Sequence, residues 1–357
     1  MIEDRLARLR DFLREKGADA ILVSKEVNLH SFSGFRGDDT VLLVSPDEAL
    51  LVTDSRYTEQ AAAQAPLYEV IRQKDGLWKE VAAAALKRGC KRRAFEGDAL
   101  LYRDYEKLGT LLTDAVLGPA ISLAPLRTVK EAEELVWMRR AAAIGDAAFD
   151  DIVKFLRPGI SENEVAVRLE STMRALGSER PAFSTIVASG PRGSLPHGVA
   201  TEKLIVAGEF VTMDYGAVVQ GYHSDMTRTV CVGKAGEKQR AVYEVVLTAQ
   251  RLGVSLVRPG ASGKEVDAAV REQIKAAGYG ENFGHGLGHS LGLEIHEEPR
   301  LSSASTCESL EPSMIVTVEP GVYLPGWGGL RIEDTVLVTE DGAEALTHSP
   351  KELIEIS

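Results

Sequence analysis

Four carboxylates in the C-terminal half of the chain adjoin apolar segments, where a fold holds side chains in fixed positions. Asp214 and Asp225 lie on the two arms of a predicted hairpin, and Glu319 and Glu333 adjoin two later apolar runs. Together with one imidazole, these oxygens suit manganese, cobalt, iron or zinc ions better than they suit a structural zinc site. Four carboxylates exceed what one divalent ion needs for charge balance. The set therefore predicts a site for two ions, about 3.5–4 Å apart.

The register of the hairpin decides how the two aspartates meet. If its loop is Val219-Gln220, Asp214 and Asp225 are directly opposed; if the loop is Gln220-Gly221, they are diagonal neighbours. Either even-length loop keeps both carboxylates on one face of the sheet. A divalent cation there would offset their repulsion. Taken alone, the pair is more typical of two solvated surface aspartates.

The segment 282–297 favours a metal site over two solvated surface aspartates. It holds three of the chain's seven histidines, His285, His289 and His296, with glycines between them. Glycine lets the backbone approach a ligand closely and adopt positive φ, so the segment indicates a site more than it indicates structural histidines. A further histidine, His197, lies in the loop 190–198.

A pair of metal ions generates a hydroxide nucleophile near neutral pH and stabilises a tetrahedral intermediate. That is hydrolase chemistry, most often on amides or phosphates. We find no phosphate-binding loop in the sequence. Amide hydrolysis is therefore the leading hypothesis, and a phosphoesterase is an alternative.

The first part of the chain carries no recognisable chemistry, but its pattern indicates an α/β fold in which helices cover a sheet. Leu6, Leu9 and Leu13 predict an opening helix that Gly17 ends. Strands are expected at 20–23, 41–44, 50–53 and 93–95, and further helices at 77–87 and 100–112. The second and third strands are expected to form a hairpin around Ser45–Glu48.

A domain boundary is expected near 124–127, which gives an N-terminal domain of residues 1–125 and a C-terminal domain of residues 126–357. A helical pattern over 129–155 opens the second domain, and Gly145 is expected to break it into two helices.

The C-terminal domain also contains an internal repeat. Arg157–Val165 recurs as Arg258–Val266, at an offset of 101 residues. Both copies predict a helix that begins with a Ser-x-x-Glu capping box and ends at glycine: Ser161 with Glu164 and Gly177, and Ser262 with Glu265 and Gly278. The repeat indicates two similar halves with a site between them.

Composition narrows the class of protein. The 357 residues suggest two domains, and 41 basic against 53 acidic residues give a net charge of −12, which disfavours a nucleic-acid partner. Cys90, Cys231 and Cys307 lie far apart, so neither a disulfide framework nor a thiolate zinc site is expected. No apolar run of about 18 residues predicts a membrane span. The N-terminus has the pattern of an amphipathic helix, so we expect a cytoplasmic location.

Five motifs resemble those of the pita-bread metallopeptidases, and within them the proline-specific branch of Xaa-Pro dipeptidase (prolidase) and aminopeptidase P. They are Met213–Gly216, Ser224–Thr229, Gly284–His289, Thr317–Gly321 and Arg331–Asp334. The resemblance covers nearly the whole chain. It implies an α/β (α+β) fold: a creatinase-type α/β N-terminal domain, and a pita-bread C-terminal domain with two pseudo-symmetric halves around a curved sheet.

The resemblance implies a ligand set and a cofactor as well. The ligands would be Asp214, Asp225, His289, Glu319 and Glu333, with the second and last of these bridging two metal ions. Mn²⁺ or Co²⁺ would be the usual ions, and Zn²⁺ or Fe²⁺ also fit. Homodimers are common among such proteins, with an N-terminal loop, here Phe35–Asp39, approaching the other subunit's site.

Further roles follow from the matching motif positions. Glu319 would move a proton, and His197 and His296 would stabilise the oxyanion or donate a proton near the scissile bond. On the substrate side, His285 would line the pocket. Arg300 would bind a substrate carboxylate or be an ordinary surface arginine, and Arg331 would brace a ligating carboxylate.

Four alternatives remain within and beyond this family. Aminopeptidase P, which cleaves Xaa-Pro from longer peptides, is the close alternative to a prolidase acting on dipeptides. Methionine aminopeptidase normally lacks a large N-terminal domain and creatinase lacks the ligand set, so both fit less well. A catalytically silent binding homologue usually loses ligands or histidines, and none is lost here.

Overall fold

The computed structural model describes residues 2–113 and 116–357. The chain divides into two compact units, residues 1–127 and residues 128–357. We call them the N-terminal unit and the C-terminal unit and describe each by itself.

The N-terminal unit is built on a six-stranded sheet with the order β4-β3-β2-β1-β5-β6. Its strands are β1 (Ala20–Val23), β2 (Val41–Val44), β3 (Ala49–Thr53), β4 (Glu69–Arg72), β5 (Arg92–Glu96) and β6 (Val116–Ile121). β2 and β3 form the hairpin predicted around Ser45–Glu48. β1 pairs antiparallel with β2 and parallel with β5, so the sheet is mixed.

Helices cover both faces of this sheet. They are α1 (Ile2–Glu15), α2 (Glu26–Ser33), α3 (Thr58–Gln64), α4 (Leu77–Lys87) and α5 (Tyr102–Leu111). Alternate residues of β1 enter two different cores: Ile21 packs with Leu9 of α1, whereas Leu22 packs with Val81 of α4. Strands buried on both faces read as continuous apolar runs, which explains why β1, β2 and β3 were predictable. The short elements α2, α3, β4 and β6 were not predicted.

The C-terminal unit contains two helix pairs and several small sheets. The helices are α6 (Ala132–Phe155), α7 (Glu162–Ala175), α8 (Glu237–Leu256) and α9 (Gly263–Ala276). The strands of its first half are β7 (Ile186–Ser189), β8 (Glu209–Tyr215), β9 (Val218–Val219), β10 (Tyr222–His223) and β11 (Met226–Val232). Those of its second half are β12 (Gly288–Ser290), β13 (Glu297–Leu301), β14 (Ile315–Val318), β15 (Gly321–Leu324), β16 (Gly328–Arg331), β17 (Asp334–Val338) and β18 (Ala343–Ala345). The last strand, β19 (Glu355–Ile356), pairs with β11 of the first half.

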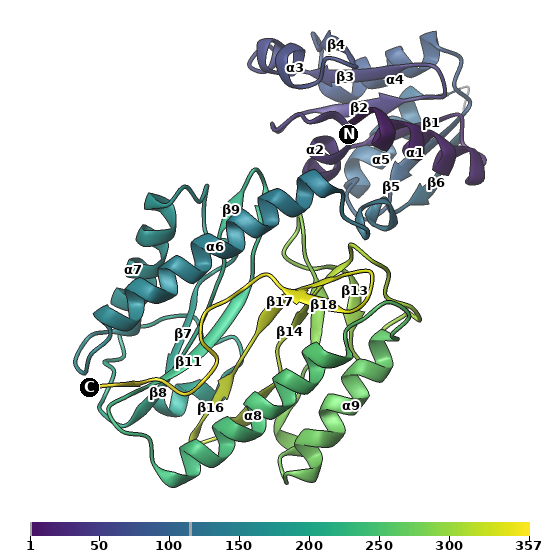
Figure 1. Ribbon diagram of the computed structural model, residues 1–357. Helices are drawn as coiled ribbons and strands as arrows, with labels where there is room; N and C mark the ends of the chain where they lie inside the picture. The colour runs from purple at the N-terminus through teal and green to yellow at the C-terminus, as the bar shows by residue number, and fades with distance from the viewer. Residues whose placement is uncertain (1, 114–115) are drawn as a thin grey trace. The chain divides into compact units, whose positions relative to one another are not determined.

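Each helix pair belongs to its own half. In Figure 1, α6 and α7 lie along one side of the strands and α8 and α9 along the other. One core joins Ile144 of α6 to Val211 of β8, and a second joins Val246 of α8 to Val316 of β14. The structure thus has the two-half arrangement that the 101-residue repeat predicts.

Local details of the repeat differ between its copies. Ser161 and Glu164 form the predicted capping box at the start of α7. The equivalent prediction for Ser262 was wrong, because that residue caps α9 without a side-chain hydrogen bond. Gly263 N–H instead donates to the carbonyl of Cys307 at 3.0 Å. A neighbouring loop therefore supplies the hydrogen-bond acceptor for one of the free N–H groups at the start of α9.

The expected break at Gly145 was also wrong. α6 runs through that residue without interruption for 24 residues. Gly145 is buried, and its carbonyl accepts a hydrogen bond from the Tyr215 hydroxyl at 3.2 Å. A glycine inside a helix costs only about 1 kcal/mol relative to alanine, and packing of the apolar face offsets that cost.

The hairpin that carries the two aspartates turns at Gln220-Gly221. Both turn residues have positive φ, 49° and 80°, as a type I′ turn requires. Val219 pairs with Tyr222, and the same register pairs Asp214 with Thr227. Asp225 is therefore the diagonal neighbour of Asp214, which confirms the second of the two predicted arrangements.

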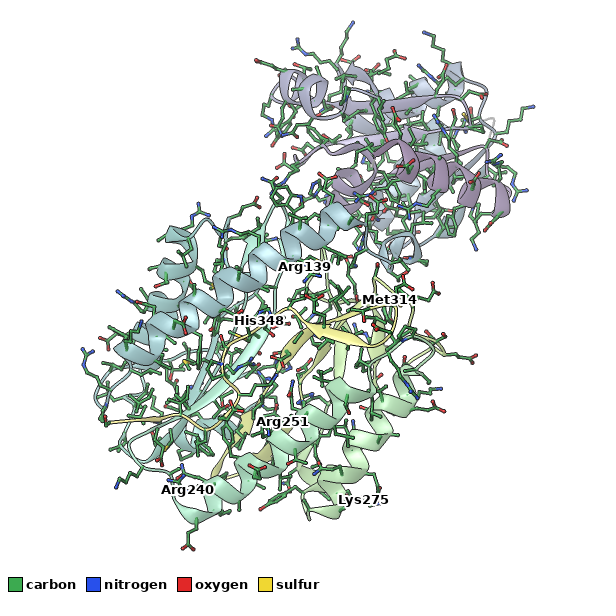
Figure 2. The ribbon with its side chains drawn as sticks, in the orientation of Figure 1. Arg139, Arg240, Arg251, Lys275, Met314 and His348 are labelled. Atoms are coloured by element: carbon green, nitrogen blue, oxygen red, sulfur yellow. The ribbon has the colours of Figure 1, made fainter. Side chains whose placement is uncertain are left out.

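The C-terminal segment contacts both halves of its unit. Asp146 of α6 accepts hydrogen bonds from the backbone N–H groups of His348 and Ser349 at 2.9 and 2.7 Å. Further on, Arg251 of α8 pairs with Glu352 at 2.6 Å. His348 and Arg251, one residue from each of these two contacts, are labelled in Figure 2. In the described part of the chain, no helix combines the length and apolar character needed to cross a membrane.

Candidate metal centre

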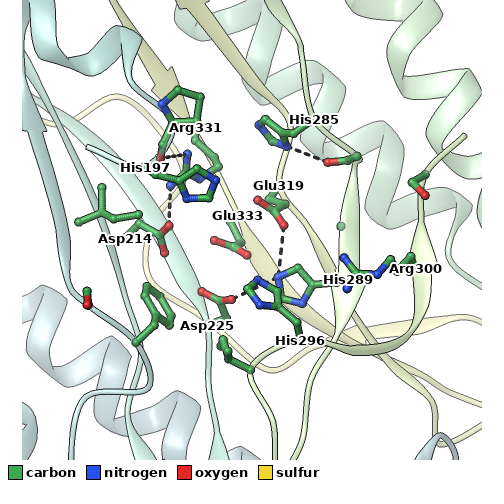
Figure 3. Close-up of a pocket in the computed structure, with 18 of the residues that line it drawn as sticks. His197, Asp214, Asp225, His285, His289, His296, Arg300, Glu319, Arg331 and Glu333 are labelled. Carbon is green, nitrogen blue, oxygen red and sulfur yellow. Dashed lines mark hydrogen bonds and ion pairs between the residues drawn. The ribbon is translucent and has the colours of Figure 1, made fainter. Parts of the chain in front are cut away.

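A cavity of about 530 Å³ opens in the C-terminal unit, between elements of both halves. All ten residues that the sequence analysis singled out line it (Figure 3): His197, Asp214, Asp225, His285, His289, His296, Arg300, Glu319, Arg331 and Glu333. Phe183, Val199 and Ile295 add an apolar part of the wall, which the sequence analysis missed. These three lie in loops without a periodic pattern.

Strand ends position the acidic and imidazole groups. Asp214 lies in β8, Asp225 immediately precedes β11, and Glu319 immediately follows β14. One ligand atom from each of Asp225, His289 and Glu333 lies within 4.8 Å of the other two. His289 Nε2 also lies 3.5 Å from Glu319 Oε1. This spacing brings Asp225, His289, Glu319 and Glu333 around a common centre, and Asp214 lines the same cavity.

Hydrogen bonds orient His289 toward that centre. Its Nδ1 lies 3.0 Å from the carbonyl of Ser290, so Nδ1 carries the proton and Nε2 offers its lone pair. The Thr317 hydroxyl accepts the His289 backbone N–H at 3.0 Å and donates to Glu319 Oε1 at 3.2 Å. Burial lowers the pKa of His289 to about 3. The imidazole is therefore neutral at ordinary pH, as a metal ligand must be.

The carboxylates of the cluster are costly to bury without a cation. Burial, and then the neighbouring carboxylates, raise the pKa values of Asp225 and Glu333 well above their ordinary range. Burial raises the pKa of Glu319 to about 7. Within the described residues, Asp214 Oδ1 is buried and has no hydrogen-bond partner. A group of buried carboxylates, one of them with an unsatisfied oxygen, beside a neutral imidazole fits divalent metal ions, which remove both the repulsion and the unsatisfied oxygen.

Arg331 is the cationic counterpart of the cluster. Its Nη2 lies 2.5 Å from Asp214 Oδ2, which is the pairing with a carboxylate that the sequence analysis expected. Nη1 donates to the Tyr323 hydroxyl at 2.8 Å, and Nε donates to Thr227 Oγ1 at 3.0 Å. Thr227 Oγ1 in turn donates to Glu333 Oε2 at 2.6 Å.

Tyr323 and Thr227 were not singled out by the sequence analysis. A signal for Thr227 existed, because it follows Asp225 by two positions and period-two alternation puts both on one face. Tyr323 carried no comparable signal. Its ring reaches the site only because β15 and β16 pair, with Tyr323 opposite Gly329.

The other histidines surround the cluster. His285 Nε2 lies 2.9 Å from the Tyr323 hydroxyl, and burial lowers the pKa of His285 to about 4. The ring of His296 stands edge-on to that of His289, with centroids 4.5 Å apart. His197 and His296 are exposed at the open side of the cavity, and so is Arg300. The exposed groups at the cavity mouth are thus separated from those buried at the centre.

Gly288 in the histidine segment allows close approach to another strand rather than to a ligand. A Cβ on Gly288 would lie 1.9 Å from the carbonyl oxygen of Thr317. None of the glycines of this segment adopts positive φ. Close packing of β12 against β14 therefore explains the glycine at this position.

Replacing Gly288 with alanine is expected to push β12 away from Thr317 and to weaken metal binding through the adjacent His289. Overpacking of this kind costs about 1–3 kcal/mol of unfolding free energy, measurable by urea denaturation. Gly284→Ala is the matched control, since its Cβ would meet no atom within 4 Å. Equal stability of the two variants would contradict the packing argument.

Two family models match the chain. The model of the Creatinase/Prolidase N-terminal domain matches residues 5–152, and that of metallopeptidase family M24 matches residues 136–340.

Individual proteins match over nearly the full length. The chain is 46% identical to the uncharacterized peptidase YqhT of Bacillus subtilis, over 98% of this chain and 99% of that protein. It is similar to the solved structure of a Xaa-Pro dipeptidase from Bacillus anthracis, with TM-score 0.97, 44% identity, and 99% and 100% of the two chains covered. It is also similar to that of an X-Pro aminopeptidase from Thermotoga maritima, with TM-score 0.92, 36% identity, and 99% and 100% covered.

Proposed function

The chain belongs to metallopeptidase family M24, and from this premise we propose that it is a prolidase, a peptidase that hydrolyses the Xaa-Pro bond of dipeptides. Family membership also confirms the metallopeptidase class and the two-domain fold that the sequence motifs predicted. The finer substrate assignment is our proposal.

We propose that five residues hold two divalent ions: Asp214, Asp225, His289, Glu319 and Glu333. Mn²⁺ and Co²⁺ suit this oxygen-rich set with a single imidazole. When bound, such ions supply a hydroxide nucleophile from water near neutral pH and stabilise negative charge in the transition state. The single observation that supports the assignment most strongly is the buried cluster of like-charged carboxylates around a neutral histidine.

The protein's own residues would then manage protons and charge. Glu319, at the edge of the cluster beside Thr317, would accept a proton and pass it to the leaving proline nitrogen. His197 and His296 are exposed at the cavity mouth, where a donor can stabilise an oxyanion on the scissile carbonyl. His285, held by Tyr323, would shape the pocket wall, and Arg331 would hold Asp214 in place.

Arg300 supports the preference for dipeptides. It lines the cavity, and within the described residues the only hydrogen bond of its side chain joins Nε to Glu298 Oε1 at 3.3 Å. Its two terminal nitrogens are therefore available to form a fork around a carboxylate. A dipeptide places its terminal carboxylate directly after proline, whereas a longer peptide places an amide there.

Aminopeptidase P activity is the second candidate. It is supported by the similarity to the Thermotoga maritima X-Pro aminopeptidase. The cavity is open to solvent beside Arg300 and His296, and an open mouth gives a longer peptide a path outward.

A comparison of a Xaa-Pro dipeptide with a Xaa-Pro-Yaa tripeptide tests the proposal. The protein would be assayed after chelation and again after loading with Mn²⁺ or Co²⁺. Metal-dependent cleavage of the dipeptide, with slow cleavage of the tripeptide, is the expected result. The reverse preference would identify an aminopeptidase P, and cleavage of neither peptide would refute both assignments.

Arg300→Gln is expected to raise KM for the dipeptide and to leave kcat nearly unchanged. A hydrogen bond to a charged group contributes about 1.5–3 kcal/mol, which corresponds to a KM increase of roughly 10- to 150-fold. Arg258→Gln, at an exposed arginine outside the cavity, is the control. Unchanged kinetics in the Arg300 variant would remove this residue from substrate recognition.

A further inference from the structure

The two halves of the C-terminal unit meet at a seam between β11 and β17, beside the proposed metal ligands. β11 belongs to the sheet β19-β11-β8-β7, and β17 belongs to the sheet β14-β17-β18. Among the described residues no strand ladder joins the two sheets. Glu333 N–H donates to the carbonyl of Thr227 at 3.1 Å, where the two strands approach. Asp225 and Glu333 therefore immediately precede strands of two different sheets.

Arg228 bridges this seam from the side away from the cavity. Its side chain is 1% exposed and pairs with Asp334, with Nη2 2.7 Å from Asp334 Oδ1. Nη1 donates both to the carbonyl of Thr227 at 3.0 Å and to the carbonyl of Glu333. Nη2 and Nε also donate to the carbonyl of Ser349, at 2.8 and 3.1 Å. One guanidinium thus contacts both strands and the C-terminal segment.

Two of the three backbone carbonyls that Arg228 contacts belong to Thr227 and Glu333; the Glu333 side chain lines the cavity, and the Thr227 side chain contacts it. Thr227 Oγ1 donates to Glu333 Oε2 at 2.6 Å on that side, and Asp225 lies two residues before Thr227. Successive side chains of a strand point to opposite faces, which explains why Arg228 and Asp334 lie behind the sheet. A change in the position of Arg228 moves the backbone that carries the ligands.

We infer that Arg228, through its pair with Asp334, is a positioning residue that fixes the separation of Asp225 and Glu333. The inference rests on the proposed function, because it treats those two carboxylates as metal ligands. Repulsion between them opposes their approach until a cation arrives. The Arg228 bridge holds the strands together in the metal-free protein, so that less reorganisation accompanies metal binding.

The neighbouring Lys351 offers a matched control. Its Nζ lies 2.5 Å from Asp334 Oδ2, the other oxygen of the same carboxylate. Its contact is with the Asp334 side chain and does not involve the carbonyls of Thr227 or Glu333. Lys351→Met therefore removes one cation from the same buried carboxylate and leaves the bridge intact.

The test compares Mn²⁺ binding by the full-length wild type, Arg228→Lys, Arg228→Met and Lys351→Met, each stripped with chelator and titrated by calorimetry. Arg228→Lys keeps a cation beside Asp334, so it is expected to fold, but a single ammonium lacks the planar fork that reaches several acceptors. Both Arg228 variants are expected to bind Mn²⁺ about 10- to 100-fold more weakly than the wild type, as loss of an outer-shell contact does. Lys351→Met is expected to bind Mn²⁺ as the wild type does, although we expect thermal unfolding to show that this variant is less stable.

The outcomes separate the inference from the function on which it rests. Arg228→Lys that binds Mn²⁺ with wild-type affinity would overturn the positioning role. Equal weakening in Lys351→Met would also overturn it, because general destabilisation would then account for the effect. Wild-type protein that binds no Mn²⁺ would refute the metal centre itself. At saturating Mn²⁺, we expect a lower kcat for Arg228→Lys and an unchanged KM, since Arg228 does not line the cavity.

Discussion

Asp225→Asn and Glu333→Gln are each expected to lower kcat/KM for a Xaa-Pro dipeptide by about 1000-fold or more, while the chain still folds. Both side chains lie within the group whose ligand atoms approach within 4.8 Å of one another. An amide presents a neutral oxygen or a nitrogen donor, so it cannot balance metal charge as a carboxylate does. Metal ions contribute several kcal/mol of transition-state stabilisation, and about 4 kcal/mol corresponds to that factor.

Folding should survive these substitutions because the charged forms are unfavourable in the metal-free cluster. The pKa of each of these carboxyls is raised by burial and by its neighbours, so a neutral isostere does not remove a stabilising charge. Steady-state kinetics with saturating Mn²⁺ and circular dichroism measure the two effects. Glu340→Gln, at an exposed carboxylate beyond the end of β17, is the control. Full activity in either ligand variant would refute the two-metal assignment.

Removal of the metal ions is expected to lower Tm of the C-terminal unit by about 5–11 °C at neutral pH. An ion present at about 100 times its Kd stabilises the folded state by about 2.7 kcal/mol. For a domain of this size, each kcal/mol shifts Tm by roughly 2–4 °C. A second ion would add to the effect. The measurement is a thermal unfolding series with and without chelator.

The loss of Tm on metal removal is expected to depend on pH. In the metal-free protein the pKa of Glu319 rises from its ordinary 4.5 to about 7, chiefly because of burial. The folded state then binds more protons than the unfolded state, so its stability falls as pH rises through this window. Metal ions reverse that loss by favouring the charged carboxylates.

The stabilisation by Mn²⁺ should therefore be small near pH 5 and should grow toward pH 8. Burial also lowers the pKa of His289 to about 3, which destabilises the metal-free and metal-loaded proteins alike below the ordinary histidine pKa, 6.5. Because His289 destabilises both proteins to the same extent, its effect cancels in the difference in Tm between the metal-loaded and the metal-free protein. A difference in Tm that is constant from pH 5 to pH 8 would contradict the buried carboxylate cluster.

Local sequence was sufficient for the parts of this protein that depend on periodicity and residue chemistry. Continuous apolar runs predicted β1, β2 and β3, because strands buried on both faces need no alternation. Period two placed Asp214 and Asp225 on one face whichever two-residue turn joined them, and the positive φ values of Gln220 and Gly221 selected the diagonal arrangement. Carboxylate and imidazole chemistry predicted a metal centre before any geometry was known.

Other features depend on contacts between residues distant in the chain, and only the tertiary structure decided them. Burial against Tyr215 keeps α6 continuous at Gly145, and a loop replaces the side-chain cap at Ser262. Tyr323 reaches the site through the pairing of β15 with β16. Arg228 reads in the sequence as an ordinary strand residue, yet it joins carbonyls from two sheets. Sequence patterns record which face a side chain occupies, whereas the meeting of two faces depends on how the halves pack.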